Sequence, residues 1–186
     1  MDAKRLLRSR LIAARAARPA AEITRARTLL ADHGVAIAAG FSRVAAFAGV
    51  GTEPPTRELL DRLRSAGLTV LLPIVAEPVL HWATYTGWDD LVPAPFGLLQ
   101  PPEPYEPPDA LATVDLVLAP ALAVDLQGNR LGWGKGYFDR ALADIEPQRV
   151  VAVVFDDEVL DEVPVQPHDR KVGAALTPDG LRRLDG

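Results

Sequence analysis

Four short runs of apolar residues constrain the fold of this chain more than any other feature of its sequence. Each run is only a few residues long, is rich in Val, Leu and Ala, and does not alternate with polar residues. Strands buried on both faces have this pattern, and they belong to parallel sheets that are covered by helices. The four predicted strands span residues 43–48, 69–73, 116–119 and 149–155.

Helical segments separate these strands. Residues 54–66 predict a helix, because the two leading prolines suit a first helical turn and Gly67 suits its C-terminal cap. A further helix is predicted over residues 137–145, between the last two strands. Parallel strands need such crossover connections, so the order of elements predicts an open, mostly parallel sheet. The expected fold class is a Rossmann-like, three-layer α/β/α arrangement in which residues 1–186 form a single domain.

Two N-terminal helices are predicted within residues 1–39, before the first strand. In residues 1–18, Leu7, Leu11 and Ala14 recur at helical spacing and predict a face that packs on a core. Basic residues follow the same spacing on a neighbouring stripe: Lys4, Arg8 and Arg15. The alternative is an organellar presequence, because this segment is rich in Arg and Ala and almost free of acid. We expect the folded helix.

A proline-rich arm over residues 93–108 follows a predicted strand at residues 81–85. The arm carries seven prolines, which exclude a regular helix or a central strand. A disordered linker is the alternative, but Phe96 and Tyr105 favour packing of the arm against the body. Residues 181–186 are expected to fray.

The composition limits the class of partner. The 25 acidic residues outnumber the 20 basic residues, which gives a formal net charge of -5 and favours neither nucleic acid nor a membrane surface. The chain has no cysteine, which excludes disulfides, thiol nucleophiles and zinc–thiolate sites. No apolar run approaches the ~18 residues of a spanning helix. We expect a soluble cytoplasmic monomer that acts on small molecules.

The candidate functional loop is residues 125–139, with the sequence DLQGNRLGWGKGYFD. Three alternating glycines at its centre allow positive φ and a close backbone approach to a ligand, and a helix N-terminus follows. Arg130 and Lys135 add positive charge to the same loop. A phosphate-bearing ligand is therefore expected. The spacing matches neither the P-loop nor the dinucleotide fingerprint, so by itself it is also consistent with a flexible surface turn.

The run GNRLGWGKGYFD resembles the R-L-G-x-G-x-G-Y-Y-D signature of the 5-formyltetrahydrofolate cyclo-ligases, also called methenyltetrahydrofolate synthetases. Five other blocks agree in order: AKRLLR, FAGVGTEPPT, FGLLQPP, DLVLAPALAVD and VPVQPHDRKV. The resemblance implies ATP-dependent cyclisation of 5-formyltetrahydrofolate to 5,10-methenyltetrahydrofolate, with release of ADP and phosphate. It also implies a phosphorylated formyl intermediate and a requirement for Mg²⁺.

The resemblance assigns a role to each matching residue. Catalytic roles fall on Arg130 and Lys135, which neutralise charge on the transferred phosphoryl group. ATP contacts fall on Lys4, Arg5, Arg8, Arg130, Leu131, Gly132, Trp133, Gly134, Lys135, Gly136, Tyr137 and Phe138. Folate contacts fall on Ala48, Glu53, Phe96 and Tyr137. The metal ligands are Asp139 and Asp169.

Plainer alternatives exist for several of these residues. The basic pair on the first helix also fits a solvated face, and the two aspartates also fit a helix start and a turn. Glu53 could equally begin a helix, and Phe96 could pack in a core. Some positions depart from the family pattern, namely Ala121, Val124, Phe138 and Gln100. The change to Phe138 removes a hydroxyl donor.

Two other functional classes compete with the cyclo-ligase. A sugar-phosphate isomerase or a transferase would use the glycine loop for a substrate phosphate without ATP, but it leaves the N-terminal block unexplained. A nucleotide- or RNA-binding module would use the Arg-rich first helix, which the acidic net charge disfavours. The three histidines lack metal-ligand spacing.

Overall fold

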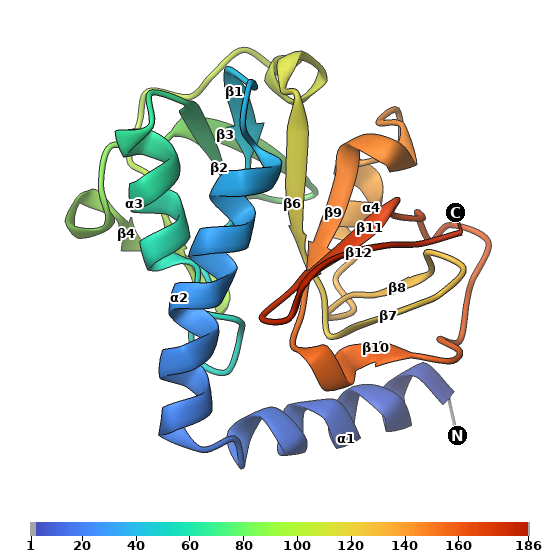
Figure 1. Cartoon of the computed structure of the whole chain (residues 1–186). Helices are drawn as coiled ribbons and strands as arrows, with labels where there is room; N and C mark the ends of the chain where they lie inside the picture. The colour runs from blue at the N-terminus through green and yellow to red at the C-terminus, as the bar shows by residue number, and fades with distance from the viewer. Residues whose placement is uncertain (1–2, 186) are drawn as a thin grey trace.

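A seven-stranded sheet forms the centre of the molecule in the computed structural model, which describes residues 3–185 (Figure 1). The strand order is β12-β11-β9-β6-β1-β2-β3. The five inner strands are parallel, and the two edge strands, β12 and β3, pair antiparallel. The strands are β1 (Arg43–Ala45), β2 (Thr69–Ala76), β3 (Val79–Thr84), β6 (Leu116–Pro120), β9 (Val150–Val153), β11 (Ala174–Thr177) and β12 (Gly180–Arg183). The predicted α/β class with a mostly parallel open sheet is confirmed.

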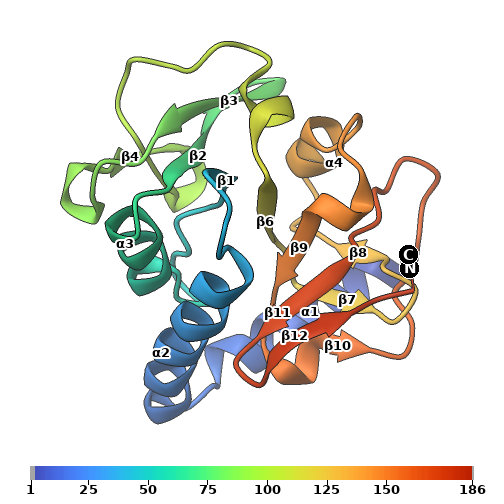
Figure 2. The ribbon, with the colours of Figure 1, turned by 45° about the horizontal axis from the view of Figure 1, so that its top comes forward.

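Helices cover both faces of this sheet. Within residues 3–185 the α-helices are α1 (Ala3–Ala16), α2 (Ala20–Ile37), α3 (Arg57–Ser65) and α4 (Tyr137–Ala141). Helices α2 and α3 lie side by side on one face (Figures 1 and 2). The other face is covered more thinly, by α4 and a 3-10 turn at Ala110–Thr113. Strand β6 is buried on both faces: Leu116 and Leu118 pack toward α2 and α3, while Val117 and Ala119 pack toward the opposite layer. This explains why its sequence is an apolar run without polar residues.

A second, three-stranded sheet supports the glycine-rich loop. It contains β7 (Ala123–Asp125), β8 (Arg130–Leu131) and β10 (Val159–Leu160), and α1 lies beneath it in Figure 1. Leu11 of α1 packs here with Leu131 and Val163. Asp125 is fully buried and accepts hydrogen bonds from the backbone N–H groups of Gln127, Asn129 and Val163 at 2.9–3.0 Å and from the Asn129 side chain at 2.8 Å. These bonds hold the β7–β8 hairpin in shape.

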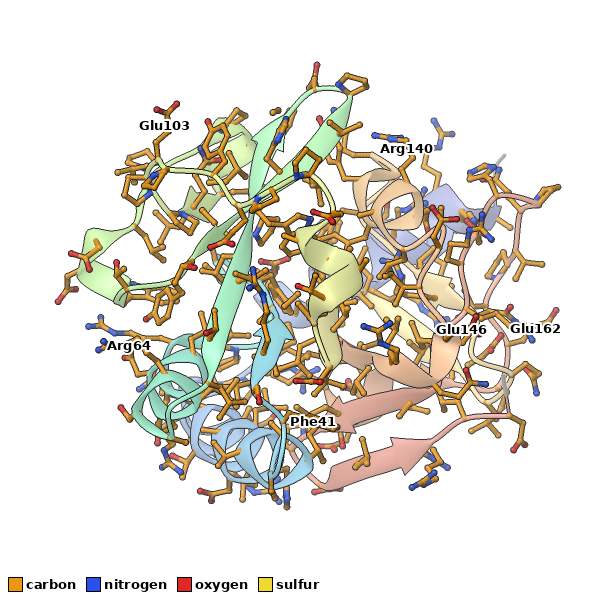
Figure 3. All side chains as sticks on the ribbon, turned by 90° about the horizontal axis from the view of Figure 1, so that it is seen from above. Phe41, Arg64, Glu103, Arg140, Glu146 and Glu162 are labelled. Atoms are coloured by element: carbon orange, nitrogen blue, oxygen red, sulfur yellow. The ribbon has the colours of Figure 1, made fainter. Side chains whose placement is uncertain are left out.

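The proline-rich arm packs on the body, as Phe96 and Tyr105 predicted. Two short strands, β4 (Val92–Pro93) and β5 (Leu99–Gln100), pair antiparallel, and 3-10 turns lie at Trp88–Asp90 and Pro95–Gly97. Tyr105 stacks on His81 with 5.4 Å between ring centroids, and the Glu106 N–H donates to the Trp82 carbonyl at 2.7 Å. Glu103 of the arm lies at the periphery (Figure 3).

Several predicted boundaries are wrong. Helix α3 begins at Arg57, so its prolines lie before the helix, and α4 ends at Ala141 instead of continuing to residue 145. Residues 181–183 do not fray, because they belong to β12 and pair with β11. Ala14 is exposed, although Leu7 and Leu11 of the same predicted face pack on the core; Lys4 and Arg15 of the basic stripe are also buried. Residues 1, 2 and 186, which the predictions included, lie outside the described residues.

Two further 3-10 turns, Pro147–Arg149 and Asp156–Glu158, lie before and after β9. Within residues 3–185, no helix has the length and apolar character needed to cross a membrane.

Candidate active site

A cavity of about 1060 Å³ opens at the carboxyl ends of the parallel strands. Its wall comes from α1, the segment after β1, strand β2, the arm, the glycine loop with α4, and the turn at residues 166–170. In α/β proteins with open sheets, ligands bind at this edge, because connections to opposite faces leave a crevice there. The cavity therefore joins parts of the chain that are far apart in sequence.

The glycine loop presents its backbone to arginine side chains, including those of Arg8 and Arg140. Gly134 and Gly136 have φ values of 100° and 69°, which residues with a Cβ rarely adopt. A Cβ at Gly134 would lie 3.3 Å from the Arg8 guanidinium carbon, and a Cβ at Gly136 would lie 3.0 Å from Arg140 Nη1. The glycines thus admit guanidinium groups close to the loop. Helix α4 has only five residues, so its dipole contributes less than predicted.

Helix α1 sends its basic stripe toward this loop. Lys4 is 4% exposed, pairs with Asp169, and donates to Gln166 Oε1 at 3.5 Å. The Arg8 Nε donates to the Gly132 carbonyl oxygen at 2.9 Å. These contacts place Lys4 and Arg8 on the cavity wall and exclude the solvated face that their spacing alone would also fit.

Both predicted metal-binding aspartates face cations. Arg130 is 3% exposed, and its Nη2 lies 2.7 Å from Asp139 Oδ1, while its Nη1 donates to the Pro120 carbonyl at 3.0 Å. The Arg170 N–H also donates to Asp139, at 3.3 Å, which brings Asp139 close to the turn that contains Asp169. Among residues 3–185, no group of three or more His, Cys, Asp or Glu side chains could hold a metal by itself.

Glu53 lines the cavity with Ala48, and it is hydrogen-bonded to Trp133 of the glycine loop. The Val50 N–H donates to Glu53 Oε2 at 3.0 Å, so Glu53 lies in the loop after β1 and does not begin a helix. Burial raises the pKa of Glu53, while the Val50 N–H, the charge of Arg15 and hydrogen bonding from Trp133 lower it. A partly desolvated acid in a cavity can accept hydrogen bonds from a heterocycle that carries N–H donors.

The arm brings Phe96 to the far rim of the cavity. Phe96 has φ 65°, a left-handed conformation that is unfavourable for a bulky residue, and its side chain is 58% exposed. Lys135 Nζ lies 4.5 Å from the centroid of the Phe96 ring. Strained, exposed aromatic residues of this kind concentrate at ligand-binding sites, so core packing does not explain Phe96.

A second set of contacts joins α4 to the β2–β3 turn across the cavity. The Tyr137 hydroxyl donates to Glu77 Oε1 at 2.6 Å, which raises the pKa of Tyr137. The Arg140 Nε donates to the Pro78 carbonyl at 3.0 Å, and its guanidinium carbon lies 5.2 Å from the Tyr137 ring centroid. Arg140 is labelled on α4 in Figure 3.

Most of the residues with predicted roles line this one cavity. They are Lys4, Arg8, Ala48, Glu53, Phe96, Arg130, Gly132, Trp133, Gly134, Lys135, Gly136, Tyr137, Phe138, Asp139 and Asp169. Two do not: Arg5 is exposed on α1 outside the wall, and Leu131 is fully buried against Leu11 in the core beneath the small sheet. Phe138 lines the wall and also packs edge-on against Trp82, at 6.2 Å between ring centroids.

Several lining residues were missed by sequence reasoning. Arg140 and Arg170 each stand one residue beyond a predicted aspartate, so their charge beside a predicted site was a usable signal. Gln100 was noted only as a departure from the family pattern, yet it lines the cavity and accepts the Val75 N–H at 3.1 Å. The apolar wall residues gave no signal, because any strand end can carry them.

The cavity lining combines two kinds of chemistry. Lysine, arginine and backbone groups gather around the glycine loop, and they suit a polyanion such as a triphosphate. Glu53 and two aromatic side chains, Trp133 of the glycine loop and Phe96 of the arm, also line the cavity, and they suit a flat heterocycle with donors at its edge. A site of this form can bring a phosphoryl donor and an aromatic acceptor together.

The sequence model of the 5-formyltetrahydrofolate cyclo-ligase family matches residues 1–178. A 5-formyltetrahydrofolate cyclo-ligase of Mycolicibacterium smegmatis is 44% identical over 142 residues, which cover 73% of this chain and 73% of the relative. A cyclo-ligase of the same name from Escherichia coli is 28% identical over 140 residues, which cover 73% of this chain and 77% of the relative.

Solved structures give the same result. The structure of Aquifex aeolicus 5,10-methenyltetrahydrofolate synthetase matches with a TM-score of 0.79 and 25% identity, covering 98% of this chain and 93% of that chain. A 5,10-methenyltetrahydrofolate synthetase from Mycoplasma pneumoniae shares the fold, with a TM-score of 0.73, 16% identity, and coverage of 94% of this chain and 98% of that chain. The sequence match includes α1, the arm and the glycine loop, which together build the cavity. The chain belongs to the 5-formyltetrahydrofolate cyclo-ligase family.

Proposed function

We propose that this chain catalyses the ATP-dependent cyclisation of 5-formyltetrahydrofolate to 5,10-methenyltetrahydrofolate. The observation that carries the proposal is the cavity itself, whose lining combines the cationic glycine loop with Glu53 and two aromatic side chains, Trp133 of the loop and Phe96 of the arm. A phosphate-binding half alone would fit many enzymes. The family and the second half together favour cyclo-ligase chemistry over a sugar-phosphate isomerase or an RNA-binding module.

The reaction needs activation of a poor leaving group. The formyl oxygen attacks the γ-phosphorus of ATP, and the bond from that phosphorus to the bridging oxygen of ADP breaks. The N10 nitrogen then attacks the activated formyl carbon, loses its proton, and the former formyl oxygen departs with inorganic phosphate. Catalysis of such a transfer depends on positioning and on stabilisation of charge.

The side chains of the cavity fit these tasks. Arg130 and Lys135 would neutralise charge on the transferred group, and Lys4 and Arg8 would hold the triphosphate from the α1 side. Arg130 is held in place by Pro120 and Asp139, whereas Lys135 lies on an exposed loop that can reach a bound phosphate. Glu53 and Phe96 would bind the pterin by hydrogen bonding and stacking.

We propose Asp139 and Asp169 as the protein ligands of a Mg²⁺ ion. Both carboxylates line the cavity, and Mg²⁺ prefers one or two carboxylates together with water and phosphate oxygens. Their present partners, Arg130 and Lys4, are cations that can turn to phosphate oxygens once a metal takes the carboxylates. When bound, the ion supplies positive charge to the β- and γ-phosphates. We also propose that the protein works in the cytoplasm as a monomer. Light scattering can test whether it is a monomer.

A spectroscopic assay tests the reaction. Purified protein with ATP, Mg²⁺ and 5-formyltetrahydrofolate should produce the near-ultraviolet absorbance of the methenyl product. Omitting ATP, or replacing it with a non-hydrolysable analogue, should abolish the signal, and ADP should accumulate in equal amount to the product. No absorbance change with saturating substrates would reject the proposed reaction.

A further inference from the structure

Arg15 is a buried charge in the last turn of α1 that the proposed reaction does not use. It lies on the same helix face as Lys4 and Arg8, one turn beyond Leu11. Unlike Lys4 and Arg8, it does not line the cavity, and its side chain has no exposed surface. A charge so far from solvent needs a partner and, beyond that, a reason to be there.

A clamp of hydrogen bonds fixes the Arg15 guanidinium. Its Nε and Nη2 donate to the two carboxylate oxygens of Glu158 at 2.6 and 2.7 Å, and Nη2 also donates to the Ala121 carbonyl at 2.7 Å. Glu158 is 2% exposed and accepts the Phe155 N–H at 2.8 Å. The remaining nitrogen, Arg15 Nη1, is buried and has no hydrogen-bond partner within residues 3–185.

A buried ion pair of this kind is not explained by stability alone. Apolar side chains of similar size commonly replace such pairs without loss of stability, because desolvation opposes the attraction between the charges. What distinguishes this pair is its neighbour. The Arg15 guanidinium carbon lies 5.9 Å from the centroid of the Trp133 ring, and Trp133 lines the cavity with Glu53.

We propose that Arg15 is a positioning residue of the folate subsite, whose clamped guanidinium supplies a fixed positive charge behind the wall formed by Trp133 and Glu53. This inference rests on the proposed role of Glu53 in binding the pterin. An ionised Glu53 accepts hydrogen bonds from the N–H donors of a pterin, whereas a protonated one loses part of that capacity. Arg15 also packs against Trp133 and so restrains the side chain that contacts Glu53.

The positive charge of Arg15 lowers the pKa of Glu53. Burial raises the pKa of Glu53, and the Val50 N–H, Arg15 and Trp133 lower it. Removal of Arg15 therefore raises the pKa of Glu53 further, and less Glu53 is ionised at a given pH. The negative charge of Glu158 opposes the positive charge of Arg15. Asp157, which pairs with Arg18 at 2.7 Å, raises the pKa of Glu158. An experiment must therefore neutralise Arg15 and Glu158 together.

The test variant is Arg15→Met combined with Glu158→Gln, which removes both charges and keeps an acceptor for the Phe155 N–H. The expected result is that the acid limb, in the pH profile of kcat/KM for 5-formyltetrahydrofolate, moves to higher pH, because less Glu53 is ionised at a given pH. The KM for ATP and the plateau value of kcat should stay unchanged. An unmoved limb, or equal losses for ATP and folate, would overturn the inference.

A conservative variant guards against misfolding of the double variant. Arg15→Lys keeps the positive charge without the fork of donors, so its acid limb should stay at the wild-type pH. If the limb moves up in Arg15→Lys as well, charge is not what Arg15 contributes. The matched control is Arg18→Met, because Arg18 lies 4.1 Å from the Phe155 ring but is not among the groups that shift Glu53. This control should keep the wild-type limb.

Glu53→Gln separates the two possible failures. If Glu53→Gln leaves the KM for 5-formyltetrahydrofolate and the acid limb unchanged, the proposed role of Glu53 fails and the role of Arg15 fails with it. If Glu53→Gln removes the limb while the Arg15 variants leave it in place, only the role of Arg15 is rejected.

Discussion

Lys135 is the residue whose contribution to turnover can be tested apart from the fold. It is exposed, and its contact is with the Phe96 ring across the cavity. Lys135→Ala should lower kcat by about 100-fold, because it removes charge stabilisation from the transferred phosphoryl group. The free energy of unfolding should change by less than about 0.5 kcal/mol, as expected for an exposed position. Steady-state assays and urea unfolding measure the two effects.

The matched control for this prediction is Lys171→Ala, an exposed lysine that does not line the cavity. It should retain wild-type turnover. Wild-type turnover in Lys135→Ala as well would remove Lys135 from the mechanism.

At the same scale, single residues show what sequence reasoning could and could not reach. The glycines, Arg130 and Asp139 stand within one short motif, so their proximity follows from chain connectivity. Asp169 comes from a distant turn, and only its matching block indicated that it joins them. The burial of Arg15 had no local signal, because its partner Glu158 is far away in the sequence.

Among the elements, α1 links stability to the proposed nucleotide site. Leu11 is 6% exposed and packs with Leu122 and Val163, and the same helix carries Lys4 and Arg8. Leu11→Ala should lower the free energy of unfolding by about 3 kcal/mol through the cavity that it leaves. It should also raise the KM for ATP, because a loosened helix holds its basic residues less firmly.

Ile12→Ala is the matched control for Leu11→Ala, because Ile12 is the next residue and is 37% exposed. Thermal and urea unfolding should show a change below about 0.5 kcal/mol, with an unchanged KM for ATP. A Leu11→Ala variant that loses stability but keeps its KM for ATP would contradict the link.

Asp115, an exposed residue just before β6, is hydrogen-bonded to the backbone at the start of strand β1. Asp115 Oδ2 accepts the N–H groups of Ser42 and Arg43 at 2.8 and 2.9 Å, and these bonds, that of Arg43 first, lower the pKa of Asp115 below 3.8. A lowered pKa stabilises the fold above pH 3.8, and this contribution is lost as the pH falls through the lower folded-state value. Asp115→Asn should therefore lower the urea midpoint at neutral pH.

The gap between wild type and Asp115→Asn should close as the pH falls below 3.8. Urea midpoints measured across this range test the sign of the effect, with the exposed Asp144→Asn as the reference substitution. A gap that is constant with pH would mean that the charge of Asp115 does not contribute.

The elements themselves were predictable to different degrees. Buried strands such as β6 and β9 follow from uninterrupted apolar runs, whereas β12 has an exposed, partly charged sequence and exists because it pairs with β11. Helix α4 is shorter than its pattern predicts. Edge strands and short helices depend on tertiary contacts, which local sequence does not report.

On the scale of the whole molecule, the cavity is assembled from two sides of the central sheet. The arm and the β2–β3 turn lie on one side, and the glycine loop with α4 lies on the other. Contacts that cross between them include those from Lys135 to Phe96, from Tyr137 to Glu77 and from Arg140 to Pro78. Sequence reasoning predicted both walls but could not predict these contacts, because their partners lie far apart in the sequence.

The contact between Lys135 and Phe96 joins groups with different proposed ligands. Lys135 would bind a phosphate, Phe96 would stack on the folate, and each must give up the other when both substrates bind. A cation–π contact at an exposed site stabilises by about 0.5–1 kcal/mol. If Lys135 and Phe96 have these proposed roles, the free protein would hold Lys135 away from ATP by that amount, which corresponds to about a two- to fivefold weaker affinity.

Phe96→Leu should separate these effects, because leucine keeps an apolar side chain at the same backbone position without a ring. The affinity for a non-hydrolysable ATP analogue, measured by calorimetry without folate, should increase about two- to fivefold. The KM for 5-formyltetrahydrofolate should rise in the same variant, because stacking is lost. Tyr105→Leu is the control, since Tyr105 stacks on His81 and does not line the cavity. An unchanged or weaker affinity for the analogue would show that Phe96 does not compete with ATP for Lys135.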